Sequence, residues 1–155
     1  MRRQDREVVQ QNEIDAIIES CDCLRLGLNA EDGAYIVPLN FAYVPGKPAK
    51  FYFHSAKEGR KVDMIGQGAK AGFELDGAHR LGEAETGCRH TFFYQSVIGT
   101  GTVRPVETLE EKKRALSAIM AHYRKDCAFS FTDEQADAVT VFCLTAETMS
   151  CKQHS

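Results

Sequence analysis

The sequence lacks a long hydrophobic run. No stretch approaches the roughly 20 apolar residues that a membrane-spanning helix needs. Residues 1–7 contain charges of both signs, and the apolar segment of a secretory signal does not follow them. We therefore expect a cytoplasmic protein that does not bind a membrane. A strong charge of one sign is absent too, because the formal net charge is −3. Such a chain offers no broad basic surface to a nucleic acid.

The six cysteines fit neither a disulfide-rich secreted domain nor a zinc site. Secreted domains of that kind are short and follow a secretory signal, whereas this chain has 155 residues. Structural zinc sites usually separate paired ligands by about two to four residues. Cys21 and Cys23 are separated by one residue, and so are Cys88 and His90. We expect reduced thiols and no metal site.

Common phosphate-binding and nucleophile motifs are missing as well. The sequence has no G-x-G-x-x-G loop, no P-loop and no G-x-S-x-G elbow. Ser55 directly follows His54, but adjacent residues of a strand point to opposite faces, which argues against a catalytic pair in contact. A serine or cysteine hydrolase is therefore disfavoured.

The patterns that are present indicate one mainly β domain over residues 1–155, with residues 1–12 and 153–155 loosely held. Period-two alternation predicts strands, and the i, i+3, i+4 spacing predicts helices. The expected strands are 23–29, 35–43, 50–54, 70–76, 92–106 and 138–144. The expected helices are 13–20, 57–66 and 108–123, with a short one near 133–136. Hairpin links between these strands favour an antiparallel β-barrel with peripheral helices.

Single residues refine this prediction. Pro38 cannot donate a ladder hydrogen bond, so it indicates a sheet edge, a bulge or an interruption that faces a ligand. Gly99 and Gly101 are expected to bend the long strand in which they lie. Thr108 and Glu111 have the spacing of a capping box at a helix start.

The stretch from Phe51 to Lys61 is the strongest candidate for a binding site. Its first half predicts a buried strand that ends at His54, and Ser55 and Glu58 have the spacing of a capping box that would start a helix. Free N–H groups at a helix start attract a phosphate. Three cations lie in the same segment: Lys57, Arg60 and Lys61. The alternative is an ordinary strand-to-helix joint with solvated cations and a histidine that makes a structural hydrogen bond.

Three motifs resemble those of FMN-binding split-barrel proteins. They are Val37-Pro-Leu-Asn-Phe41, Phe51-Tyr-Phe-His-Ser-Ala-x-x-Gly-x-Lys61, and Tyr94-Gln-Ser-Val97 followed by Gly99-x-Gly101. Their order and spacing, over about residues 12–152, are similar to the branch related to pyridoxamine 5'-phosphate oxidase that includes the 5-nitroimidazole-resistance (Nim) proteins. The resemblance implies a six-stranded antiparallel split β-barrel, mainly β with peripheral helices.

The resemblance also implies a homodimer with two FMN molecules in grooves at the subunit interface. The implied cofactor-binding residues are Val37, Pro38, Leu39, Asn40, His54, Ser55, Ala56, Lys57, Lys61, Tyr94, Gln95, Ser96 and Val97. His54 is the implied catalytic residue, near the flavin. The chain departs from the family at its last strand, which often ends in a T-G-K-like turn. Cys151 takes the place of the glycine here, and the role of Lys152 stays open.

The function implied by the resemblance is that of an FMN-dependent oxidoreductase. It would pass electrons from a reduced nicotinamide or another donor to a small organic acceptor, for which a nitroaromatic is one candidate. Two alternatives stay open: a non-catalytic flavin-binding or redox-sensing dimer, and a split barrel that uses another ligand such as haem or a deazaflavin. The residue chemistry suits a flavin, because its phosphate needs cations and its ring needs an apolar slot with a few backbone hydrogen bonds.

Overall fold

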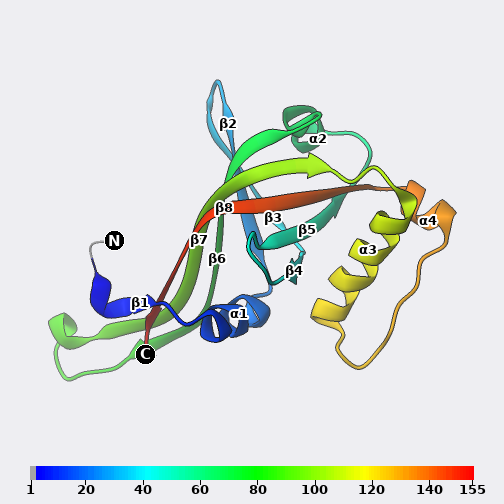
Figure 1. The fold of residues 1–155 in the computed structure, drawn as a ribbon. Coiled ribbons are helices and arrows are strands. Elements are labelled where there is room, and N and C mark those ends of the chain that lie inside the picture. Colours follow the sequence, from blue (N-terminus) through cyan, green and yellow to red (C-terminus); the bar gives the residue numbers. More distant parts are fainter. Residues whose placement is uncertain (1–2) are drawn as a thin grey trace.

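The computed structural model describes residues 3–155, which form eight strands and four α-helices (Figure 1). The strands are β1 (Glu7–Val8), β2 (Leu24–Ala30), β3 (Gly33–Leu39), β4 (Ala42–Val44), β5 (Lys50–Ser55), β6 (Ala69–Gly82), β7 (Thr91–Pro105) and β8 (Thr140–His154). The helices are α1 (Gln11–Ser20), α2 (Arg60–Ile65), α3 (Leu109–Tyr123) and α4 (Asp133–Asp137), with 3-10 turns η1 (Gln4–Arg6) and η2 (Gly87–Arg89). In residues 3–155, no helix has both the length and the apolar composition to cross a bilayer.

Chain connectivity closes the sheet into a split barrel. All strand pairs are antiparallel, in the order β3-β2-β6-β7-β8-β5-β4, and β1 pairs with the end of β8. β3 and β4 lie at opposite ends of this order, yet only Asn40 and Phe41 separate them in the chain. The two edges must therefore meet. The side chains that fill the interior include Leu24, Leu26, Phe41, Phe51, Phe53, Phe73, Leu75 and Val97.

The predicted fold class is confirmed, but the predicted count of six strands is wrong. The expected strand over residues 35–43 is two strands, β3 and β4, because the chain leaves the sheet at Asn40 and Phe41. The backbone N–H of Phe41 donates to the hydroxyl of Tyr123 in α3, at 3.1 Å, instead of to a neighbouring strand. β1 is the other addition, a segment of 2 residues that the sequence pattern did not indicate.

The two predicted helix starts have different outcomes. Thr108 is the N-cap of α3, and its hydroxyl accepts a hydrogen bond from the backbone N–H of Glu111. The predicted cap at Ser55 is wrong, because β5 continues through Ser55 and pairs it with Thr140. α2 starts later, and Gly59 is its N-cap. The φ of Gly59 is 128°, a backbone conformation that residues other than glycine rarely adopt.

The first and the last strand of the chain pair with one another. β1 pairs Glu7 with Lys152 and Val8 with Cys151. The last strand, expected over residues 138–144, continues through His154 because β7 pairs with it along nearly its whole length. Segments 7–8 and 153–154, which we expected to be loosely held, are therefore in strands; residues 1–2 lie outside the described part of the chain.

The predicted bend at Gly99 and Gly101 corresponds to an irregularity between β7 and β8. Their register shifts between Thr100 and Gly101. A Cβ atom on Gly99 would overlap the Phe73 ring and the carbonyl oxygen of Thr148. Glycine is required here because the Phe73 ring and the backbone of the paired strand β8 lie so close that a side chain has no room.

We predict that Gly99→Ala lowers the free energy of unfolding by about 1–3 kcal/mol, the usual range for overpacking a core. Urea denaturation of wild type and variant measures the change. Gly87→Ala is the matched control, because a Cβ on Gly87 meets open space and should change stability by no more than about 0.5 kcal/mol. Equal stability of the two variants would contradict the close crossing at Gly99.

Candidate functional site

His54 and Lys61 form a corner where the end of β5 meets α2. His54 pairs with Val141 of β8, and Lys61 is in the first turn of α2. Burial, and then the charge of Lys61, lower the pKa of His54 below its ordinary value of 6.5. Burial also lowers the pKa of Lys61. The lowered pKa favours the neutral form of the His54 imidazole, next to a half-buried ammonium group.

The three cations of this segment differ in their partners. Lys57 Nζ pairs with a carboxylate oxygen of Asp137 at 3.2 Å, and an Arg60 nitrogen pairs with Asp32 at 2.7 Å. Within residues 3–155, Lys61 makes no salt bridge to any carboxylate. A half-buried cation without a counter-charge is costly, so Lys61 is the cation of this corner best suited to an external anion.

His54 also lies at an apolar cavity of about 230 Å³ under two helices. The other lining residues are Leu116, Ile119, Met120, Phe131, Gln135 and Val139. They come from α3, from α4 and from the segments on either side of α4. The sequence did not place these helices over His54, because their distance along the chain hides the contact.

The motif Tyr94–Val97 lies on β7, and its side chains point in different directions. Val97 is 0% exposed and belongs to the barrel core, so only its backbone can reach a ligand. Gln95 donates to Gln153 of β8 at 3.1 Å. Ser96 lines an open depression of about 300 Å³ together with Lys152 and three further residues, Glu7, Ile98 and Ser150.

Arg6 joins this group, although no sequence pattern pointed to it. Its guanidinium lies 3.4 Å from the hydroxyl of Tyr94 and 3.3 Å from Nε2 of His154. In residues 3–155, Arg6 Nε is the buried side-chain polar atom that has no hydrogen-bond partner. A buried donor without a partner costs free energy, so Arg6 Nε lowers the stability of the protomer.

The third motif, Val37–Asn40, lies where the barrel closes. Pro38 pairs with Arg25 at the outer edge of the sheet, as expected of a residue that cannot donate. Leu39 is buried in the barrel core, and Val37 is packed against it. Pro38, Leu39 and Asn40 line an open depression of about 290 Å³ with Asp22 and Cys23.

Within one chain, two of the three motifs lie at opposite ends of β8. His54 pairs with Val141 near the start of β8, whereas Ser96 pairs with Lys152 near its end. Positions 141 and 152 are about 35 Å apart along a strand that rises about 3.3 Å per residue. Figure 1 shows β8 running from the side of α4 to the C-terminus. One protomer thus brings His54, Ser55 and Lys61 together but not with Tyr94–Val97.

Comparisons with known proteins identify the family. A sequence model of the pyridoxamine 5'-phosphate oxidase family matches residues 10–153. The chain belongs to this family. No curated protein matches it by sequence.

Solved structures agree with the oxidase family. A protein from Bacteroides thetaiotaomicron, described as a 5-nitroimidazole antibiotic resistance protein, is 30% identical, with a TM-score of 0.80 over 95% of this chain and 86% of that one. An FAD and haem binding protein from Mycobacterium smegmatis is 15% identical, with a TM-score of 0.81 over 97% and 74%. A flavocytochrome from Azotobacter vinelandii is 16% identical, with a TM-score of 0.78 over 100% and 72%. The last two show the fold alone. The resemblance to Nim-related split barrels is confirmed.

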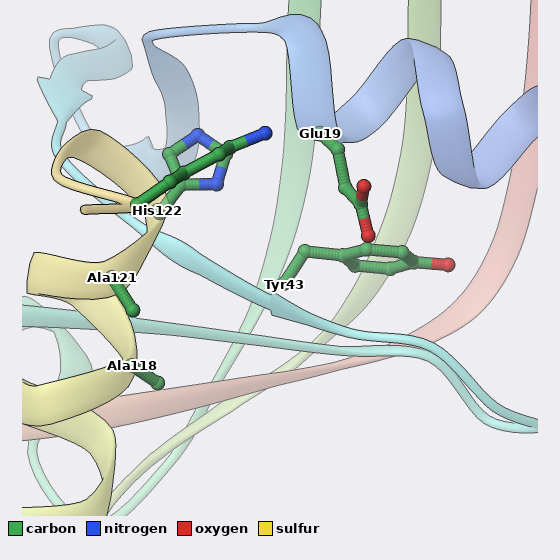
Figure 2. Close-up of a pocket in the computed structure, with 6 residues that line it drawn as sticks. Glu19, Tyr43, Ala118, Ala121 and His122 are labelled. Atoms are coloured by element: carbon green, nitrogen blue, oxygen red, sulfur yellow. The ribbon is translucent and has the colours of Figure 1, made fainter. Parts of the chain in front are cut away.

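This oxidase-family chain has a further cavity, of about 480 Å³, on the other side of α3 (Figure 2). Its lining residues are Glu19, Tyr43, Ala118, Ala121, His122 and Lys125. Two of them have structural bonds: His122 Nε2 lies 2.8 Å from the carbonyl oxygen of Cys21, and the Tyr43 hydroxyl donates to Asp15 at 2.6 Å. Those bonds tie α3 and β4 to α1.

The lowered pKa of His54 predicts a pH-dependent stability. His54 is protonated less readily in the folded state than in the unfolded chain. Its contribution to the free energy of unfolding is therefore fully present above pH 6.5 and is lost as the pH falls through the folded-state pKa. His54→Ala should remove this loss, and Lys61→Gln should reduce it by removing one of its two causes. Urea denaturation of the three proteins between about pH 5 and 7.5 checks the prediction; parallel curves would contradict it.

Proposed function

We propose that this member of the oxidase family is a cytoplasmic flavoprotein oxidoreductase. It binds FMN without covalent attachment at a homodimer interface and transfers electrons to a small organic acceptor. A reduced nicotinamide is the proposed donor, and a nitroaromatic is one candidate acceptor. The observation that supports this proposal most directly is Lys61, a half-buried cation beside His54 that has no anionic partner within residues 3–155.

The corner suits a flavin phosphate in both charge and position. A dianionic phosphate next to Lys61 offsets the cost of burying the ammonium group. The partners of Lys57 and Arg60 are exposed carboxylates, and exposed pairs contribute little to stability. Both cations can therefore turn to a phosphate at little cost. The hydroxyl of Ser55, at the end of β5, adds a donor. The short helix α2 contributes less than the sequence suggested, because it begins only at Arg60.

A second protomer is needed to complete the proposed site. In a two-fold dimer every contact between the chains occurs twice, so a Lys61 end placed against the Tyr94–Val97 end of the partner would create two equivalent sites. Apolar side chains exposed outside the barrel support such contact: Ile36, Leu81, Phe92 and Ile98 are 63%, 51%, 52% and 56% exposed.

His54 has a defined chemical role in this proposal. A bound flavin supplies the hydride or electron transfer. The neutral imidazole has one N–H donor and one lone pair, so it holds a polar group of the acceptor molecule. A phosphate that neutralises Lys61 removes one of the two causes that lower the pKa of His54. Binding of the anion therefore raises the fraction of His54 that is protonated near pH 7 and can donate a proton.

We expect Lys61→Glu to weaken FMN binding by about tenfold to several hundredfold, because it replaces a charge-assisted contact with repulsion. Titration of flavin-free protein with FMN, followed by flavin fluorescence, measures the affinity. Lys47→Glu, the same charge reversal at an exposed turn residue, is the control and should bind like wild type. Unchanged affinity in Lys61→Glu would place the phosphate elsewhere.

An absorbance spectrum separates the ligands that this fold can hold. Flavin bands that appear on purification or after incubation with FMN support the proposal. A Soret band would favour haem, and a protein that stays colourless with FMN and gains no thermal stability rejects the proposal. Tight FMN binding without reduction by NADH or NADPH, and without activity in a broad acceptor screen, would identify a flavin-binding or redox-sensing dimer instead.

The proposed dimer interface can be tested by a substitution on β7. Ile98→Glu places a charge on an exposed apolar position of β7 and should raise the dimer dissociation constant by at least tenfold, with a parallel loss of FMN affinity. Sedimentation equilibrium measures the dissociation constant of the dimer, and fluorescence titration measures the affinity for FMN. Leu109→Glu, at the start of α3 and 38% exposed, is the control. A monomeric wild type that binds FMN tightly would refute the shared site.

A further inference from the structure

The cavity beside His54 has its own apolar wall, separate from the barrel core. Helices α3 and α4 pack on the outside of the sheet through a second cluster of buried residues: Val106, Ala115, Leu116, Ala136 and Val141. Phe131 and Val139 are packed against this cluster from the segments that flank α4. The cavity of about 230 Å³ lies between these helices and His54.

Among the residues that line this cavity, two are polar and none has a formal charge at pH 7. The polar residues are His54, which is neutral, and Gln135. The remaining residues are aliphatic, aromatic or thioether side chains. A charged ligand would lose its hydration without gaining a counter-charge from these walls. The chemistry of the lining therefore selects a neutral and largely apolar ligand.

The orientation of the Gln135 amide is fixed by the start of α4. Thr132 and Gln135 form a complete capping box, in which Gln135 Oε1 accepts a hydrogen bond from the backbone N–H of Thr132 at 3.0 Å. Because that donor requires an oxygen acceptor, the amide cannot be flipped. The oxygen is engaged in the cap, so the NH₂ group is the part of this side chain that is left to donate to a ligand in the cavity that Gln135 lines.

We propose that this cavity binds a small, neutral, single-ring compound with one hydrogen-bond acceptor, held by the Gln135 amide and His54. An enclosed apolar cavity of about 150 Å³ binds benzene-sized molecules, and this cavity of about 230 Å³, which is partly open to solvent, has room for a ring with one substituent. The position next to His54 makes this compound the electron acceptor of the flavin reaction, a role that rests on the proposed function. The binding site itself does not depend on that role.

Acetophenone and toluene are matched probes for this site, because they share a ring and differ in the carbonyl acceptor. Each is titrated into flavin-free protein with labelled methyl groups. The methyl resonances of Met120, Ile119 and Leu116 should shift, and intermolecular NOEs should connect them to the probe ring. Acetophenone should bind about three- to tenfold more tightly than toluene, the effect of one net hydrogen bond.

Two adjacent residues of α3 provide matched variants. Met120 lines the cavity beside His54, whereas Ala121 is exposed and lines the larger cavity on the other side of the helix (Figure 2). Met120→Trp should fill the cavity and abolish the shifts at Ile119, and Ala121→Trp should leave them unchanged. The wild-type chain has no tryptophan, so the fluorescence of the new side chain at position 120 reports whether it is buried, and thermal denaturation followed by circular dichroism reports whether each variant is folded.

The outcomes separate this proposal from the flavin proposal. The absence of methyl shifts in wild type up to the solubility limit of acetophenone, or equal binding by the two tryptophan variants, overturns the site. FMN affinity is measured on the same samples. Loss of FMN as well as acetophenone in folded Met120→Trp would assign the cavity to the flavin and overturn the inference, while the proposed function stands. Acetophenone binding by a wild type that cannot bind FMN supports the site and overturns its role in electron transfer.

Discussion

The hydrogen-bond ladder of β8 is the constraint on which the rest of the structure depends. Its first half pairs with β5, nearly its whole length pairs with β7, and its end pairs with β1. A strand of 15 residues that serves three partners fixes the register of all of them at once. The same ladder separates the His54 corner from the Tyr94 motif by most of its length. Strand pairing within one chain therefore keeps these two groups of residues apart, whatever the identity of any single side chain.

Near each end of β8 lies a polar group that lacks a partner within residues 3–155. At the His54 corner a half-buried ammonium group has no counter-charge within the described chain, and its charge adds to burial in lowering the pKa of the neighbouring imidazole. At the Tyr94 end a buried guanidinium N–H has no acceptor. Both deficits lower the stability of an isolated protomer, and both are reduced by an anion or a polar partner. Such unsatisfied groups are tolerated at binding sites because the ligand completes them.

The prediction of fold succeeded where local periodicity is strong. The long strands and the helix after Thr108 are present, and the barrel class followed from their hairpin links. It failed at Ser55, where the capping-box spacing is real but β5 keeps that residue in the sheet. The prediction also treated β3 and β4 as one strand, because the residue that interrupts them, Tyr123, is far away in the sequence. Both errors come from tertiary contacts that override a local preference.

The sequence alone determined the barrel class, the membership of an oxidase family and the three motifs with their chemistry, since alternation, turn residues and motif spacing are local properties. The tertiary structure decided how those motifs are grouped. Burial isolated Lys61 from carboxylates while Lys57 and Arg60 found partners. Packing of α3 and α4 built an apolar cavity over His54, and strand register placed the Tyr94 motif out of its reach. These outcomes depend on which distant segments meet, and that information appears only when the chain has folded.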